Sequence, residues 1–566
     1  MSLSESKALI SNHLTLREPS QVMDLKRMGA AFPTRLSFMR ILLRHLIKEK
    51  VEVKRRVWDI DSCGIGHAIY SVELFNQIYS LIAFSILITP EERTDRVIAE
   101  KWDTTYVLFD GAPKFSDIER LRLNVPLQEA GRFEASELIL SRANKSVRLF
   151  DYVVECLSNG HQPDDQIVSQ IGYLMRTTAV YGNGKFGIAD HGKIVDEHGL
   201  KEPFQAELLT IWLIRGFTHD LVEHIAYYRN PKFFVTLDLR LKKYLGIGNA
   251  TGLGMAPFLV THPILIHNWA LIKELALGRL RGIKKIDAEI SKLIIKLITR
   301  AEKHLNQWDV NDLRQSSRIN VLRREIVVVK NLITSNWLNF DYPWERLIKT
   351  SSCWSIECQE LIIALILEPY GALIDDLADC MSTNAACNLD PAMTIGDLKN
   401  LLVTNYDWAL LIDFNNPKSS ELFWYVSEEK LEPRLGSRLN QAGVEKEMPI
   451  DVARQIQDLA RTLKFVSKKQ LVAEFLLKFP EQRQIVKRVQ GLKNFSFSEI
   501  RTNLISSECM PIDMLRWKLA FFGACKFDPK SDRWTRVTLY QGAPIASEVQ
   551  AGSRDDWWLP VLESLK

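Results

Sequence analysis

The sequence lacks the patterns that identify most specialised classes of protein. Its eight cysteines are scattered and none forms a Cys-x-x-Cys pair, so neither a zinc ribbon nor a thioredoxin-type redox site is expected. It also contains no internal repeat and no complete catalytic motif of a known family. The opening residues, MSLSESKALISNHLTL, are acidic and polar where a signal peptide needs a basic start and an apolar run, which predicts a cytoplasmic location.

An excess of charge of one sign is missing as well. Lys and Arg number 73 against 69 Asp and Glu, which leaves a formal net charge of +4, and the two signs are interleaved along the chain. Such a balance gives no strong field for a polyphosphate backbone, so nucleic acid is not expected as a main partner. Apolar residues make up 46% and charged residues 25%, which is typical of a globular protein.

No Lys, Arg, Asp or Glu occurs in residues 244–272, although this segment contains four glycines, two prolines, two histidines and two asparagines. It is long enough to span a membrane, but its glycines and prolines would free backbone groups that lipid cannot satisfy, so no membrane is expected. Each unpaired polar group buried in protein costs ~1–3 kcal/mol. A segment that is uncharged, polar and bent is therefore our candidate for a functional centre.

Hydrophobic periodicity predicts an α+β fold that is predominantly α-helical, with a large helical body, a small antiparallel N-terminal sheet and short C-terminal strands. We predict an α+β domain with an antiparallel meander at 1–125, the helical body with the site at 126–400, and an α+β C-terminal region at 401–566. Expected strands are 55–61, 67–74, 77–85, 104–111, 406–414 and 422–429, with a hairpin at 533–549. Expected helices are 38–50, 136–160, 163–177, 205–217, 286–305, 311–333, 356–368, 450–464, 468–479 and 481–492.

The stretch GIGNATGLG could present several backbone N–H groups to a phosphate or carboxylate at a helix start. Its candidate ligand-binding residues are Gly246, Gly248, Asn249, Thr251, Gly252 and Gly254. Thr251 occupies the third glycine position of a dinucleotide-binding fingerprint, and no Gly-Lys-Ser/Thr of a P-loop follows, so the cofactor stays unknown. The alternative is that these glycines allow close packing and a tight bend, with Asn249 and Thr251 as caps.

Two histidines lie on either side of Pro263 in the same segment. Proline disfavours α conformation at the preceding residue and starts helices well, so we expect His262 at a kink and a helix running on from Pro263. His262 is the first candidate acid or base, and His267, one turn into the helix, is the second. For His267 the alternative is a core histidine whose hydrogen bonds are satisfied.

A second glycine-rich polar segment, YGNGKFGIADHGK at 181–193, follows a helix expected to end near Arg176. Asn183 and Lys185 in this segment, together with Arg176, are further candidate ligand-binding residues, and the alternative is an exposed hairpin. Arg142, Asn144, Lys145 and Arg148 are expected on the 136–160 helix. They would favour an anion nearby or form an ordinary solvated face.

In THDLVEH, residues 218–224, His219 and Glu223 lie four residues apart on one helix face. They are candidate catalytic residues as an acid–histidine pair, and with His224 they could supply metal ligands if a third group joined them. The order is not the HExxH of zinc proteases, because His219 and His224 are five residues apart. No metal site is assigned, and surface ion pairing is the alternative.

Together these features predict a cytoplasmic enzyme that acts on a small anionic metabolite by histidine acid–base chemistry beside a glycine-rich anion-binding loop. One alternative is a non-catalytic helical scaffold or regulatory protein. Another is a metal-dependent enzyme that uses the region of His219, Glu223 and His224. The expected partner is a small anionic molecule, and homo-oligomer formation is left open.

Overall fold

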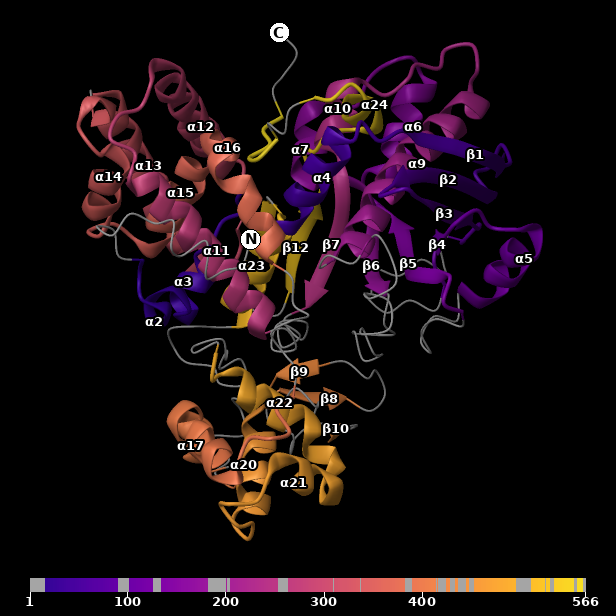
Figure 1. The fold of residues 1–566 in the computed structure, drawn as a ribbon. Coiled ribbons are helices and arrows are strands. Elements are labelled where there is room, and N and C mark those ends of the chain that lie inside the picture. Colours follow the sequence, from indigo (N-terminus) through magenta and orange to yellow (C-terminus); the bar gives the residue numbers. More distant parts are fainter. Residues whose placement is uncertain are drawn as a thin grey trace.

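The computed structural model of the 566-residue chain describes most but not all of its residues. The described ranges are 16–89, 101–125, 134–181, 200, 204–252, 263–308, 310–335, 337–381, 389–413, 415, 424–427, 433–435, 444–446, 452–494, 511–524, 526–529, 534–553 and 557–562. They form a large body and a small lobe below it in Figure 1.

A nine-stranded sheet is the centre of the body, with the strand order β1-β2-β3-β4-β5-β6-β7-β12-β11. The strands are Val53–Ile60 (β1), Gly66–Leu74 (β2), Gln77–Ser85 (β3), Thr104–Asp110 (β4), Glu137–Lys145 (β5), Tyr173–Tyr181 (β6), Gly246–Gly252 (β7), Lys526–Pro529 (β11) and Trp534–Leu539 (β12). The prediction of a small antiparallel N-terminal sheet is therefore wrong. The sheet is large and mixed, because β6 and β7 pair in parallel whereas the other neighbours are antiparallel.

The structure describes sixteen α-helices in the body. They are Pro19–Val22 (α2), Leu25–Gly29 (α3), Phe38–Lys48 (α4), Phe115–Asn124 (α5), Phe150–Ser158 (α6), Asp165–Ile171 (α7), Gln205–Arg229 (α9), Leu239–Tyr244 (α10), Pro263–Arg281 (α11), Ala288–Asn306 (α12), Leu313–Thr334 (α13), Pro343–Ser351 (α14), Ile356–Leu367 (α15), Gly371–Ile374 (α16), Pro511–Phe522 (α23) and Ala546–Gln550 (α24). The 3₁₀ helices are Trp337–Asn339 (η4), Glu368–Tyr370 (η5) and Asp375–Cys380 (η6). The helices α12 to α15 form a group to one side of the sheet (Figure 1).

The two faces of the sheet are covered differently. The 25-residue helix α9 crosses one face and contacts strands β3 to β7, where Tyr106 and Met175 belong to the main hydrophobic core. On the other face a smaller cluster, which includes Val107 and Leu140, packs against Ile118 of α5. This smaller cluster draws its sheet residues from β2 to β5, together with Val57 of β1, and takes none from the described residues of β6, β7 and β12.

The small lobe comprises the described residues between 389 and 494, and it has a hydrophobic core of its own. Its elements are Ile395–Asn405 (α17), Asp407–Leu410 (α18), Trp424–Ser427 (β8), Pro433–Leu435 (β9), Val444–Lys446 (β10), Val452–Leu463 (α20), Val472–Lys478 (α21), Pro480–Gln482 (η8) and Arg483–Gly491 (α22). The three strands form a separate sheet in the order β10-β8-β9. The predicted domain boundaries at residues 125 and 400 remain predictions.

Most of the predicted helices and the first four strands are confirmed, but three segments differ from expectation. The first half of the predicted helix 136–160 is β5, whose residues from Glu137 to Ala143 are all buried between two neighbouring strands. The predicted helix 163–177 stops at Gly172, which has a positive φ of 79°, and β6 follows. The predicted strand 406–414 begins with the helix α18, and the second arm of the expected hairpin at 533–549 is the helix α24.

Candidate functional site

The glycine-rich stretch that was expected to form a loop at a helix start is the strand β7. Arg176 of β6 lies directly opposite Gly248 of β7, and on the other side Gly248 lies opposite Thr538 of β12. Successive side chains of a strand point to opposite faces, so Gly246, Gly248, Ala250 and Gly252 share one face, which we call the Arg176 face. Asn249 points to the opposite face.

Two of the predicted ligand-binding glycines are held by close packing. A Cβ atom at Gly246 would lie 2.1 Å from the carbonyl oxygen of Leu539, and one at Gly248 would lie 2.5 Å from Cγ of Tyr173. Both distances are far inside van der Waals contact. These contacts explain why residues 246 and 248 carry no side chain, and they leave little room for a ligand over either residue.

Three arginines share the Arg176 face. Arg176 lies opposite Asn144 of β5, Arg142 is two residues from Asn144, and Arg536 of β12 lies opposite Ala250. Arg142 is buried, with its guanidinium 4.6 Å from the ring of Trp102, whereas Arg176 and Arg536 are half-buried. Neither Arg176 nor Arg536 makes a hydrogen bond or ion pair in the part of the chain that the structure describes.

One described carboxylate beside these strands, that of Asp103, has a backbone partner. Asp103 directly precedes β4, and its Oδ2 accepts a hydrogen bond of 3.0 Å from the backbone N–H of Lys145. Its own backbone N–H donates to Oδ1 of Asn144 at 3.0 Å. The Arg176 face between β5 and β12 is therefore rich in cations, while the same face between β2 and β5 is apolar and packs on α5.

The two glycine-rich polar segments of the sequence leave the sheet at the same edge. β6 ends at Tyr181 and β7 ends at Gly252, and these two strands run in parallel. In open sheets the carboxyl edge of parallel strands is where ligands usually bind. The predicted residues Asn183, Lys185, Gly254 and His262 follow these strand ends and lie outside the described residues.

His219 and Glu223 of α9 do not form the predicted acid–histidine pair. Oε1 of Glu223 accepts a hydrogen bond of 2.8 Å from Leu237 N and lies 2.7 Å from Nζ of Lys242. His219 is buried, and burial, with Arg215 and Lys242 nearby, holds its pKa well below the usual range, so the imidazole is neutral at physiological pH.

The neighbouring pair, Asp220 and His224, also turns outward to separate partners. Asp220 Oδ2 accepts from the hydroxyl of Tyr70 at 2.6 Å, and His224 Nδ1 accepts from Nε1 of Trp58 at 3.1 Å. The other ring nitrogen of His224 lies 2.8 Å from the carbonyl oxygen of Asp61. Across the described ranges no group of three or more His, Cys, Asp or Glu residues is placed to hold a metal ion.

The predicted helix start at Pro263 is confirmed as the first residue of α11. His267 is half-buried on the first turns of this helix, and the next residue, Asn268, is buried with only 1% of its surface exposed. Oδ1 of Asn268 has no hydrogen-bond partner among the residues that the structure describes. Because buried polar atoms usually have a hydrogen-bond partner, a hydrogen-bond donor placed beside this amide oxygen at the start of α11 would be stabilised.

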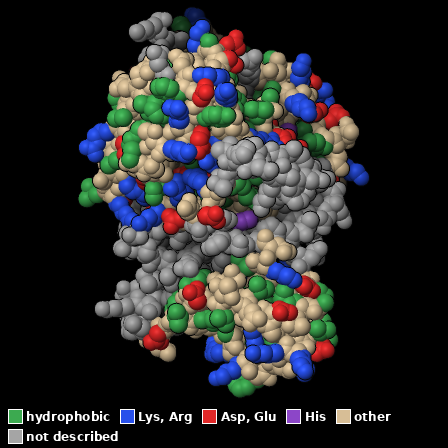
Figure 2. All heavy atoms as spheres, turned by 60° about the vertical axis from the view of Figure 1, so that its left-hand side comes forward, with side chains coloured by type: hydrophobic (Ala, Val, Ile, Leu, Met, Phe, Trp, Pro, Cys, Tyr) green, Lys and Arg blue, Asp and Glu red, His purple; other side chains and the backbone are tan. Residues whose placement is uncertain are grey.

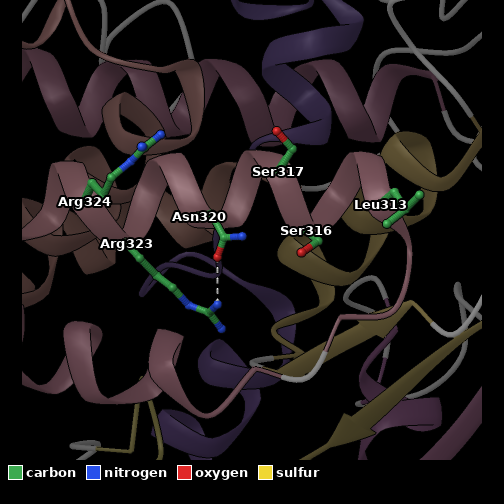
Figure 3. A pocket seen from close by; sticks show the side chains of 6 residues that line it. All are labelled: Leu313, Ser316, Ser317, Asn320, Arg323 and Arg324. Atoms are coloured by element: carbon green, nitrogen blue, oxygen red, sulfur yellow. Dashed lines mark hydrogen bonds between the residues drawn. The ribbon is translucent and has the colours of Figure 1, made fainter.

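A separate open depression of about 590 Å³ lies on α13 and is lined by Leu313, Ser316, Ser317, Asn320, Arg323 and Arg324 (Figure 3). Arg323 points along its wall and is used structurally, because its guanidinium donates to the carbonyl oxygens of Leu305 and Trp308. It also donates to Oδ1 of Asn320 at 3.0 Å. The guanidinium of Arg323 is therefore already engaged by the protein itself, while Arg324 on the same helix is exposed.

Sequence reasoning missed Arg536 and placed Arg142 on a helix. Only the pairing of β12 with β7, almost 300 residues apart in the chain, brings Arg536 next to the glycine-rich strand. None of the described helices is both long and apolar enough to cross a membrane. Comparison of the chain with protein-family models, with curated proteins and with solved structures gave no match.

Proposed function

We propose that this protein is a cytoplasmic enzyme that binds a small phosphate- or carboxylate-bearing metabolite on the Arg176 face, at the carboxyl edge of β6 and β7. The acid or base of the reaction is His262, which follows β7 by ten residues. The observation that carries the proposal is Arg176, a half-buried guanidinium without a hydrogen bond or ion pair among the described residues.

A half-buried arginine without a partner is unfavourable unless something else compensates its charge. Arg536 has no described partner either, and Arg142 adds a third cation to the same face. Like charges repel, so three cations on one face favour the approach of an anion. The planar guanidinium suits phosphate and carboxylate groups, because it offers two parallel N–H donors to two oxygens.

β7 lies between the strands that carry Arg176 and Arg536. On this face Gly246 and Gly248 are packed against Leu539 and Tyr173. The proposed ligand therefore lies nearer the carboxyl end of β7, beyond Gly248. Glycine is used where a ligand or another backbone approaches the main chain closely.

Ligand-induced stabilisation of the whole chain tests the binding step. Inorganic phosphate, pyrophosphate and citrate are the probes, and a ligand at a hundredfold excess over its Kd should stabilise the protein by about 2.7 kcal/mol. We expect Arg176→Gln to remove the response without lowering the stability of the free protein. The matched control is Arg148→Gln, at an exposed arginine two residues before α6, which should respond like the wild type.

Catalysis is tested separately with the His262→Ala variant. Incubation of the protein with a mixture of phosphorylated and carboxylated metabolites, followed by mass spectrometry, should show one compound consumed by the wild type and untouched by the variant. Equal consumption by both would remove His262 from the mechanism. A scaffold would be favoured if no anion stabilised the protein and affinity purification recovered a protein partner. The metal-dependent alternative would be favoured if elemental analysis found a stoichiometric metal.

A further inference from the structure

The near-neutral charge of the whole chain conceals a strongly basic part. Residues 452–493 of the small lobe contain ten Lys and Arg but only three Asp and Glu. Seven of these cations make no ion pair with the described residues: Lys464, Lys468, Lys469, Lys478, Arg483, Lys487 and Lys493. Figure 2 shows Lys and Arg side chains gathered around a hydrophobic side chain at the lower end of this lobe, away from the body.

The helix α22 carries two of these seven cations, Arg483 and Lys487, on its outward face. Ile485, Val486 and Val489 point into the core of the lobe, where α22 packs against α17 and α20. Residues at steps of three and four share a helix face, so Arg483, Gln484, Lys487 and Arg488 form the opposite face. Arg483 and Gln484 are exposed, and Lys487 and Arg488 are half-buried.

The inward side of α22 is fixed firmly enough to present that face as a rigid unit. The side chain of Gln490 is buried, and its Nε2 donates to the carbonyl oxygen of Asp390 at 2.7 Å. Its Oε1 accepts from the backbone N–H of the same residue at 2.9 Å. These two bonds tie the end of α22 to the segment that leads into α17. An outward face held in this way keeps its geometry when a partner binds.

We infer that the outward face of α22 binds duplex DNA, with α22 in the major groove, Gln484 towards the base edges, and Arg483 and Lys487 against the phosphates that flank the groove. The major groove admits an α-helix, and a glutamine amide pairs with adenine. α21 and α22 are joined by a short turn at η8, an arrangement in which the second helix can enter the groove while the first lies across the backbone. The narrow major groove of duplex RNA excludes a helix.

An anionic membrane is the main competitor, because Phe465 is 88% exposed between Lys464 and Lys468. Insertion of one aromatic ring flanked by lysines is typical of peripheral membrane binding. The outward face of α22, however, carries no apolar side chain, and a membrane would leave the amide of Gln484 without a specific partner. The charge and polarity of this face therefore fit a nucleic-acid groove better.

The test uses the full chain and a labelled random-sequence duplex of about two helical turns, measured at several salt concentrations. Arg483→Gln combined with Lys487→Gln should weaken binding at least about tenfold and reduce the slope of log K against log salt by about 1.8, because each lost phosphate contact contributes ~0.9. The matched control combines Lys292→Gln with Lys296→Gln, two exposed lysines that are also four residues apart, on α12 of the body. This control should bind like the wild type.

The inference is overturned if the wild type binds no duplex at low salt, or if the α22 and α12 variants lose affinity equally. Preferential binding to single strands or duplex RNA would overturn it too, as would preferential binding to phosphatidylserine vesicles. Thermal unfolding of both double variants should match that of the wild type, since all four side chains are exposed or half-buried. Retention of the phosphate response of the Arg176 face in the α22 variant would show that the two sites are independent.

Discussion

The body and the small lobe use charge in opposite ways. In the body, several ion pairs are buried and join segments that are far apart in the chain, as in the 2.7 Å pair of Arg40 with Glu368, whose side chains are 0% and 6% exposed. In the small lobe, the pair of Arg461 with Asp458 lies within one turn of α20, and its side chains are 77% and 53% exposed. The body thus uses buried charge to hold distant segments together, while this pair of the lobe is exposed and lies within a single helix.

The centre of the charge network in the body is Glu360 of α15. Its carboxylate accepts from Arg27 at 2.9 Å and from Lys273 at 2.7 Å, and Arg17 lies at 3.4 Å. Arg17 also reaches Glu274 of α11. Three parts of the chain, the N-terminal segment, α11 and α15, are therefore held together by a single buried carboxylate and its neighbour.

The largest expected effect in this comparison is that of Glu360→Gln. The substitution leaves Arg17, Arg27 and Lys273 without their shared anion in a site where Glu360 is 2% exposed. Removal of one partner from a buried ion pair costs about 3–5 kcal/mol. Denaturant unfolding followed by circular dichroism should show this loss in the body, and a change below 1 kcal/mol would mean that water or a rearrangement compensates the three cations.

Acid should weaken the same network. Burial alone would raise the pKa of Glu360, but Lys273, Arg17 and Arg27 outweigh it and lower the pKa to about 2, against 4.5 in an unperturbed glutamate. Because the folded-state pKa is depressed, this stability is present above pH ~4.5 and is lost as the pH falls towards 2, amounting to about 3 kcal/mol. The loss on acidification should shrink in the Glu360→Gln variant. An unchanged pH dependence in that variant would show that other carboxylates cause the acid sensitivity.

The sequence predicted local elements well where side-chain periodicity decides them and poorly where distant strands decide them. α12, α13 and α15 were predicted within a few residues, because each shows helical spacing of apolar residues. The run ELILSRANK at 137–145 also contains apolar residues at helical spacing, yet it forms β5 between β4 and β6. A strand that is buried on both faces loses the alternation by which strands are recognised.

The candidate site shows the same limit. The sequence predicted Arg176 and the stretch GIGNATG as ligand-binding residues, and the structure places Arg176 beside Gly248. It could not show that this stretch is a strand, because glycine is unfavourable in strands and the contacts that require it come from Tyr173 and Leu539. Arg536 is absent from the prediction for the same reason, since only strand pairing brings β12 to the site.

Two glycine substitutions compare a crowded with an open position in the body. In Gly248→Ala the new Cβ would lie 2.5 Å from the ring of Tyr173, and overpacking of this kind costs about 1–3 kcal/mol. Gly216 of α9 is exposed and has nothing within 4 Å of an added Cβ, so Gly216→Ala should stabilise the helix by about 0.5–1 kcal/mol. Thermal unfolding measures both. A neutral Gly248→Ala would show that Tyr173 can move aside and that packing does not require this glycine.

The smallest expected effect is in the small lobe, with Glu474→Gln as the counterpart of Glu360→Gln. Glu474 is exposed on α21 and makes no ion pair with the described residues, so the stability should change by less than about 0.5 kcal/mol. The lobe is held by the apolar core that includes Ile456, Phe475 and Val486, whereas its surface charges contribute little to folding. Removal of one of the three acidic groups in residues 452–493 should nevertheless strengthen DNA binding severalfold at low salt, because the field of the basic surface increases. A stability loss comparable to that of Glu360→Gln would mean that the charges of the lobe are structural after all, and the contrast between the two regions would fail.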